Sequence, residues 1–126
     1  MATVLVIDDV PVFRDVVQHA LAAAGHVVLT ANNGAEGLKR LESDKVDLVL
    51  LDLAMPEMDG VSFLRRLRAD KQFDALPVLV VTALSESSQV REARQMGALG
   101  PLLKSRFSLR DLLKSVSTIL PPASAA

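Results

Sequence analysis

Side chains that could take part in a chemical reaction follow four of the apolar runs in this sequence, at the point where each run ends. They are three carboxylates, one hydroxyl and one ammonium: Asp8, Asp9, Asp52, Thr82 and Lys104. An acidic residue after a strand often caps the next helix, and this is the simplest explanation for any one of these residues. It explains this set poorly, because Asp52 precedes Leu-Ala-Met-Pro, which is not a helix start, and adjacent Asp8 and Asp9 cannot both cap one helix.

Gathered in one place, these groups favour phosphoryl transfer. Two carboxylates ~4 Å apart repel by about 4 kcal/mol at an effective dielectric near 20, so three in one cleft call for a cation. Carboxylate oxygens suit Mg²⁺, which commonly binds through one or two carboxylates plus phosphate oxygens. A lysine suits a phosphoryl oxygen. A carboxylate nucleophile with such neighbours can take up a phosphoryl group, since positioning and charge neutralisation supply most of that catalysis.

The elements that must position these residues alternate along the chain. Short apolar runs predict strands at Thr3–Ile7, Val27–Thr30, Val46–Leu51, Pro77–Val81 and Gly100–Leu103. Longer patterns with capping residues predict helices at Pro11–Ala24, Asn33–Glu42, Gly60–Ala69, Ser85–Gly97 and Ser108–Leu120. Leu109, Leu112, Leu113 and Val116 repeat with helical spacing, which predicts one buried stripe on the last helix.

The third apolar run indicates the architecture. Val46–Leu51 is apolar at nearly every position, as expected for a strand that is covered on both faces. Strict alternation of strands and helices then predicts an α/β fold, a doubly wound parallel sheet with helices on both sides. Ligands of such sheets bind at the carboxyl ends of the strands, where the polar residues stand.

Bulk composition limits the function classes. The chain has 126 residues, half of them hydrophobic, which fits one domain with an aliphatic core. Without cysteine, thiol catalysis and cysteine-ligated metals are excluded. A net charge of −1 gives no indication of nucleic-acid binding, which needs a concentrated basic surface. The sequence shows neither a signal peptide nor a membrane span, so we expect a cytoplasmic protein with one domain at 1–120 and a disordered tail at 121–126.

Several motifs in order resemble one known family over about the whole chain, from Thr3 to Leu120. The motifs are Asp8-Asp9, the segment Asp52-Leu-Ala-Met-Pro-Glu-Met-Asp-Gly60, Thr82-Ala83, Gly97-Ala98 and Lys104. Together they resemble the receiver domain of two-component response regulators. The resemblance implies a flavodoxin-like (βα)5 fold with five strands in the order 2-1-3-4-5.

The resemblance also implies roles for the residues. Asp52 would be the phosphoacceptor, and Mg²⁺ would be bound by Asp8, Asp9, Asp52 and the backbone carbonyl of Ala54. Thr82 and Lys104 would contact the phosphoryl group. The donor would be the phosphohistidine of a histidine kinase or phosphotransfer protein, and the receiver would signal to an output partner as a monomer or weak dimer. The domain would not be an enzyme beyond its own phosphorylation and dephosphorylation.

Two positions depart from that family's pattern, Pro101 and Ser105. Pro101 stands where an aromatic residue is usual, so we expect activation to move the segment 82–88 and the start of the fourth helix instead. Ser105 stands where a cis proline is usual, and a cis bond before a non-proline residue costs about 2.5–4 kcal/mol, so we expect a trans Lys104–Ser105 bond. The resemblance also implies that Ala54 and Leu84 flank the phosphoryl group. Both are apolar, so neither can orient an attacking water, which predicts slow dephosphorylation.

Three other functions are weighed against this one. A flavin-binding module would need a hydroxyl- and glycine-rich loop after the first strand, where Asp8-Asp9-Val10-Pro11 stands. A phosphatase of the haloacid dehalogenase type would need an aspartate two residues after Asp52, where Ala54 stands. The third alternative is a receiver that is never phosphorylated and serves as a protein-interaction module.

Overall fold

The computed structural model describes residues 2–55, 58–83 and 87–120, so the predicted tail at 121–126 lies outside the described residues. The strands are β1 (Thr3–Ile7), β2 (Val27–Ala31), β3 (Leu48–Leu51), β4 (Val78–Thr82) and β5 (Leu99–Leu103). The helices are α1 (Pro11–Ala23), α2 (Gly34–Ser43), α3 (Gly60–Arg68), α4 (Ser88–Gln95) and α5 (Leu109–Ile119). Two short 3-10 helices are η1 (Lys71–Phe73) and η2 (Lys104–Arg106).

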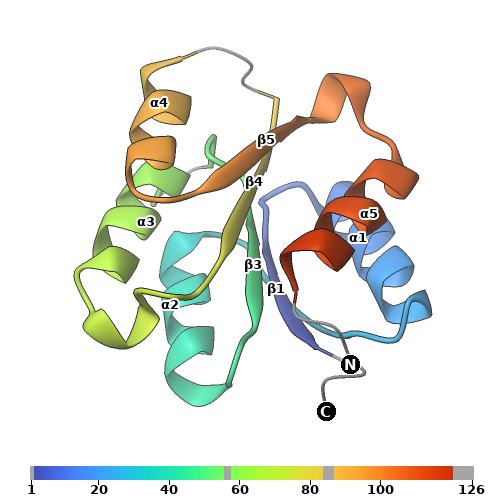
Figure 1. Cartoon of the computed structure of the whole chain (residues 1–126), viewed down its shortest axis with the longest axis horizontal. Helices are drawn as coiled ribbons and strands as arrows, with labels where there is room; N and C mark the ends of the chain where they lie inside the picture. Colours follow the sequence, from blue (N-terminus) through green and yellow to red (C-terminus); the bar gives the residue numbers. More distant parts are fainter. Residues whose placement is uncertain (1, 56–57, 84–86, 121–126) are drawn as a thin grey trace.

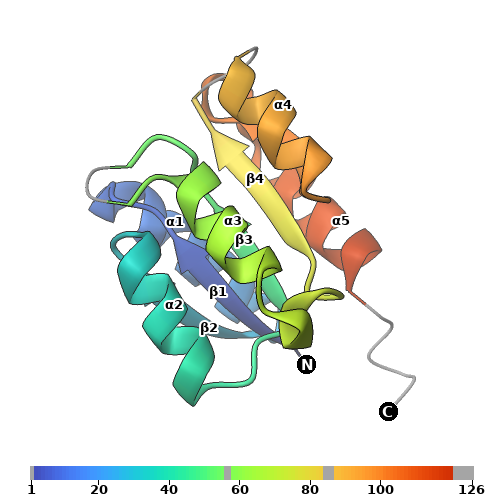
Figure 2. The same ribbon diagram turned by 90° about the vertical axis from the view of Figure 1, so that its left-hand side faces the viewer.

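The strands form one parallel sheet in the order β2-β1-β3-β4-β5, as the sequence predicts. Helices α2, α3 and α4 cover one face, and α1 and α5 cover the other (Figure 1). The view turned by 90° shows the same layers, with α2, α3 and α4 in front of the sheet (Figure 2). The prediction of a doubly wound α/β fold is therefore confirmed.

Each face of the sheet has its own aliphatic core, because successive strand residues point to opposite sides. Leu5, Ile7 and Leu51 pack beneath α2, α3 and α4 together with Phe63, which is fully buried. Val4, Val6 and Leu50 belong to the second core, beneath α1 and α5. All four residues of β3 are buried, as the apolar run predicts.

The helix ends follow from capping. Asn33 and Ser108, the first residues of two predicted helices, accept hydrogen bonds from the backbone N–H of Glu36 and Asp111 and so cap α2 and α5. The fourth helix begins later than predicted, because Ser87 accepts from the N–H of Val90 and so caps it. The predicted earlier start at Ser85 lies outside the described residues. No helix in the described ranges has both the length and the apolar character to cross a bilayer.

Strand β5 forms one edge of the sheet and carries a bulge. Leu79 pairs with Leu99 but Val81 pairs with Leu102, so β5 holds one residue more than β4 across this interval. Gly100, at φ +95°, supplies the backbone conformation that side chains disfavour. The cis peptide bond among the described residues is Gly100–Pro101, so Lys104–Ser105 is trans, as the sequence predicts.

Arg65 and Arg66 of α3 are exposed, whereas Arg68 at the end of the same helix is half-buried. The half-buried Arg68 guanidinium donates hydrogen bonds to three backbone carbonyls, those of Phe73, Leu76 and Met96. Its burial also lowers the pKa of Arg68. Arg68 therefore connects α3 to the segment after it and to the end of α4.

Candidate functional site

The site forms where β1 and β3 end side by side. Ile7 pairs with Leu51, so the next residue of each strand, Asp8 and Asp52, reaches the same edge of the sheet. The N–H of Asp52 donates to the carbonyl of Ile7 at 3.0 Å and continues the strand pairing by one residue. Parallel register therefore places the two carboxylates next to each other.

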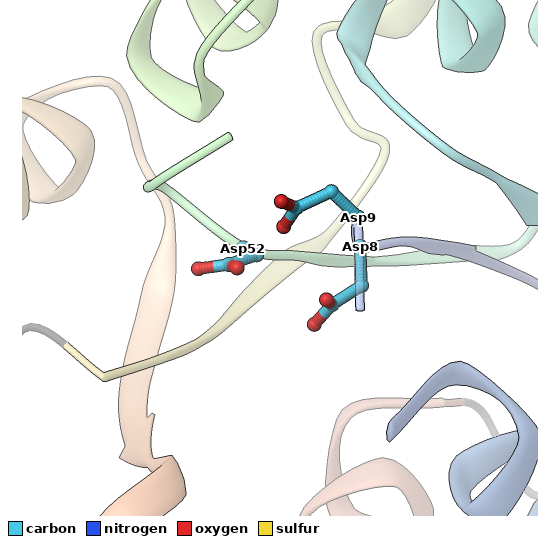
Figure 3. Close-up of side chains that lie close together, drawn as sticks. All are labelled: Asp8, Asp9 and Asp52. Carbon is cyan, nitrogen blue, oxygen red and sulfur yellow. The ribbon is translucent and has the colours of Figure 1, made fainter. Parts of the chain in front are cut away.

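Asp9 completes a cluster of three carboxylates. One oxygen from each of Asp8, Asp9 and Asp52 lies within 4.8 Å of the other two. Figure 3 shows the three side chains turned toward a common space at the strand ends. Asp8 and Asp52 are only 2% and 5% exposed, whereas Asp9 is half-buried. The cluster thus combines two buried acids with one that solvent reaches.

Lys104 bridges the two buried acids. Its Nζ lies 2.8 Å from Oδ2 of Asp8 and 3.2 Å from Oδ2 of Asp52. The lysine reaches them from the first residue of η2, directly after Leu103 of β5. Among the described residues, Lys104 alone forms ion pairs with this cluster. Three carboxylates therefore lie together with one ammonium.

The remaining contacts hold the acids in place. Oδ1 of Asp8 accepts from the N–H of Val10 at 2.9 Å, and Oδ1 of Asp52 accepts from the N–H of Ala54 at 3.2 Å. Arg14 donates from Nη1 to the main-chain carbonyl of Asp8 at 2.7 Å. Each buried carboxylate therefore keeps one oxygen on a backbone donor and turns the other to Lys104.

Burial and charge shift the acid–base behaviour of the site. Burial raises the pKa of Asp8 above its ordinary value, although the hydrogen bonds from Lys104 and from the Val10 N–H oppose this. Burial alone would lower the pKa of Lys104, but its hydrogen bond with Asp8 and the negative charges of Asp52 and Asp8 outweigh that effect and raise it. Burial thus disfavours the charged form of both groups, but only for Lys104 do the partner charges reverse the direction of the pKa shift.

Thr82 and Ala54 lie at the same edge. Thr82 is the last residue of β4 and is fully buried, and it pairs with Leu103, the residue before Lys104. Ala54 is exposed two residues after Asp52. Leu84, which the sequence predicts at this site, lies outside the described residues.

Sequence reasoning missed the aromatic residues beside Lys104. The Nζ of Lys104 lies 4.5 Å from the centre of the Phe13 ring, and the Phe107 ring meets Phe13 edge to face at 4.9 Å. The available signal was the spacing of Phe13, Val17 and Leu21, which places Phe13 at the site end of the buried stripe of α1.

Comparison with known proteins decides the family. The family model described as response regulator receiver domain matches residues 4–117. This chain belongs to the response regulator receiver family. Among curated relatives, protein PilH of Pseudomonas aeruginosa is 32% identical over 120 residues, which cover 95% of this chain and 98% of PilH.

Two solved structures extend the comparison. The chemotaxis protein CheY4 of Vibrio cholerae matches with a TM-score of 0.88 and 34% identity, over 95% of this receiver and 99% of CheY4. The response regulator TrrA of Thermotoga maritima, solved in complex with Mg²⁺-BeF, matches with a TM-score of 0.82 and 31% identity, over 95% of this receiver and all of TrrA. Other curated relatives are longer, and the receiver spans 48% of one of them and 15% of another.

Proposed function

We propose that this receiver accepts a phosphoryl group on Asp52 from the phosphohistidine of a histidine kinase or phosphotransfer protein. The observation that carries the proposal is the state of Asp52, a buried carboxylate held by the Ala54 N–H and by Lys104 within an acidic cluster. One oxygen of Asp52 attacks phosphorus while the P–N bond of the donor breaks. The bonding electron pair stays on the imidazole nitrogen, and an acyl phosphate forms on Asp52.

The donor set fits a magnesium ion. Among the described residues, three carboxylates lie within 4.8 Å of one another, and the Lys104 ammonium contacts two of them, Asp8 and Asp52. Mg²⁺ prefers such hard oxygen ligands. Asp8, Asp9, Asp52 and the backbone carbonyl of Ala54 would hold the ion. When bound, it would neutralise negative charge on the phosphoryl oxygens.

The protein's own residues would do the rest. Lys104 would move from the carboxylate of Asp52 to a phosphoryl oxygen, where its charge stabilises the product. Thr82 would offer a hydroxyl at the same edge. The backbone N–H groups of Val10 and Ala54 keep Asp8 and Asp52 oriented throughout.

On this proposal the receiver is a signalling domain whose catalysis is limited to its own phosphorylation and dephosphorylation. It would work in the cytoplasm, as a monomer or weak dimer, and pass its state to an output partner. Ala54 and Leu84 offer no polar group to an attacking water, so the acyl phosphate would hydrolyse slowly. The alternative of a receiver that is never phosphorylated lacks support, because all five residues of the expected site are present: Asp8, Asp9, Asp52, Thr82 and Lys104.

Treatment with acetyl phosphate and Mg²⁺, followed by intact and peptide mass spectrometry, tests the proposal. We expect one phosphoryl adduct, on Asp52, that base removes and acid preserves. Asp52→Asn should abolish the adduct, and excess chelator should prevent it. Asp47→Asn is the matched control, since Asp47 lies at the opposite end of β3 and accepts from the Thr3 N–H. An adduct that survives in Asp52→Asn contradicts the proposal.

A further inference from the structure

The Lys104 ammonium lies between the acid cluster and an aromatic ring. On one side are Asp8 and Asp52, and on the other is the face of Phe13, 4.5 Å from Nζ. The side chain of Lys104 is consequently only 17% exposed. A cation over a ring face is attracted by the negative face of the π system, and desolvation strengthens the attraction.

A second ring supports the first. Phe107 meets Phe13 at 4.9 Å between ring centres and 63° between planes, an arrangement that aromatic pairs favour. The chain has only four aromatic residues, all phenylalanine, and two of them meet here. The other two, Phe63 and Phe73, pack on the opposite face of the sheet.

The backbone around Lys104 does little to fix the position of the ammonium, so a contact from another element is needed to hold it. The ammonium ends a flexible four-carbon stem, and η2 is a single turn with no side-chain cap. Phe13, in contrast, stands in the first turn of α1, two residues after Pro11, which fixes the backbone there. The ring is thereby tied to the same short segment that carries Asp8 and Asp9.

We propose that Phe13, braced by Phe107, is a positioning residue that holds the Lys104 ammonium against Asp8 and Asp52. The role in phosphoryl transfer rests on the proposed function, but the position of Lys104 can be measured without it. The ring also keeps water from one side of the ammonium. Leucine in place of Phe13 would fill similar space but would offer the ammonium no negative face.

Nuclear magnetic resonance of the metal-free protein, with no phosphodonor, tests the position directly. With ¹³C-labelled lysine, we expect the ε-protons of Lys104 to be shifted upfield by the ring and to give a nuclear Overhauser effect to the Phe13 ring protons. Lys104→Met assigns the signal. Phe13→Leu should lose the upfield shift and Phe13→Tyr should restore it, whereas Phe73→Leu, the matched control on the other face, should leave it unchanged.

Phosphorylation rates of the same variants test whether the position of Lys104 matters for the reaction. Under acetyl phosphate and Mg²⁺, Phe13→Leu should take up phosphoryl about three- to ten-fold more slowly, as expected from the size of a partly desolvated cation–π interaction, and Phe13→Tyr should match the wild type. Phe107→Leu should reduce both the shift and the rate to an intermediate degree.

The outcomes separate the two proposals. If Phe13→Leu keeps the upfield shift, or if the wild-type protein gives no Overhauser effect between Phe13 and Lys104, the positioning role is overturned; the second result needs no variant to fold. An unchanged phosphorylation rate in Phe13→Leu also overturns it. If even the wild type takes up no phosphoryl group, the proposed function fails while the position of Lys104 is still decided by the spectra.

Discussion

Asp9 differs from the other two acids of the cluster in its access to solvent. Asp8 and Asp52 are buried and contact Lys104, whereas Asp9 is half-buried and has no ion pair among the described residues. Its carboxylate lies close to those of Asp8 and Asp52, and repulsion among the three charges opposes the folded state of the metal-free protein. The same negative charge would attract a bound cation such as Mg²⁺.

We therefore expect Mg²⁺ to stabilise the protein, and Asp9 to control the size of the effect. Mg²⁺ at ten times its Kd should add about 1.4 kcal/mol and raise the Tm by about 5 °C. Asp9→Asn should raise the metal-free stability by about 1 kcal/mol and reduce the response to Mg²⁺. Calorimetry with and without Mg²⁺ measures both. A Tm that does not respond to millimolar Mg²⁺ in the wild type would count against the metal site.

Gly60 lies against the backbone of the phosphoacceptor segment. A Cβ there would come within 2.5 Å of the Asp52 carbonyl oxygen and 2.7 Å of the Leu53 Cα. Asp59 caps α3 by accepting from the Ser62 N–H, so the start of the helix is fixed at this spot. Only glycine permits the close approach.

Alanine at position 60 should consequently be costly through crowding alone. We expect Gly60→Ala to lower the free energy of unfolding by about 3 kcal/mol, at the upper end of overpacking costs, and to weaken Mg²⁺ binding by displacing Asp52. Gly25→Ala is a useful contrast, because nothing lies within 4 Å of its Cβ but its φ is +95°. It should cost about 1–2 kcal/mol and leave Mg²⁺ binding intact. Urea denaturation and a Mg²⁺ titration give the two readings.

At the scale of elements, Arg68 ties together parts that are distant in sequence. The end of α3, the segment 73–76 and the end of α4 all meet at its guanidinium. Arg65 adds an ion pair from α3 to Glu92 of α4, but both partners are exposed, so its contribution is small. The hydrogen bonds of Arg68 are charge-assisted and half-buried, which makes them stronger.

Arg68→Met should therefore destabilise the fold far more than a change at a neighbouring arginine. We expect a loss of about 2–3 kcal/mol, the usual size for hydrogen bonds to a charged group whose partners are left unsatisfied. Arg66→Met is the matched control on the exposed face of α3 and should change stability by less than about 0.5 kcal/mol. Urea denaturation measures both variants. Similar losses in the two would mean that the three carbonyls find other donors.

The elements also mark what sequence can and cannot predict. The sequence predicts β1 to the residue, because an apolar run bounded by Asp8 leaves no choice. The start of α4 is harder, since several serines stand before it and each could serve as the cap. The bulge at Gly100 depends on the pairing of β5 with β4, a tertiary property. Arg68 was predictable in part, because it follows Leu64 by four residues and so shares its face.

The charged residues of the site could be predicted from the sequence, but the aromatic contact that positions Lys104 could not. Asp8, Asp9, Asp52 and Lys104 come together because strand ends of a parallel sheet meet at one edge, which the alternating pattern requires. The placement of Phe13 over Lys104 depends on how α1 lies against the segment after β5. No local pattern fixes that packing.

At the scale of the whole molecule, the site lies at one edge of a sheet whose two faces carry different helices. Pro101 stands on β5 where the family usually has an aromatic residue, and its ring is small and its φ is locked. We therefore infer that a conformational change that starts at Asp52 reaches the rest of the molecule by a route other than β5. The segment from Thr82 to Ser88, of which residues 84–86 lie outside the described part, leads from the site to α4.

We accordingly expect activation to alter residues 82–90 rather than β5. Hydrogen exchange with and without Mg²⁺ and beryllofluoride, which mimics a phosphoryl group, should change protection in that segment and at the start of α4. Asp52→Asn treated in the same way is the control and should show no change. Changes concentrated at residues 99–103, with 83–90 unaffected, would contradict this route.

The bulged edge strand has a consequence for how copies of this protein meet one another. An open sheet edge offers a row of backbone donors and acceptors to any passing strand, and long regular edges promote aggregation. On β5 that row is broken, because Pro101 has no N–H and the extra residue at Gly100 disturbs the spacing. This edge is thereby protected against strand addition, which lowers the tendency of copies of this protein to aggregate through β5.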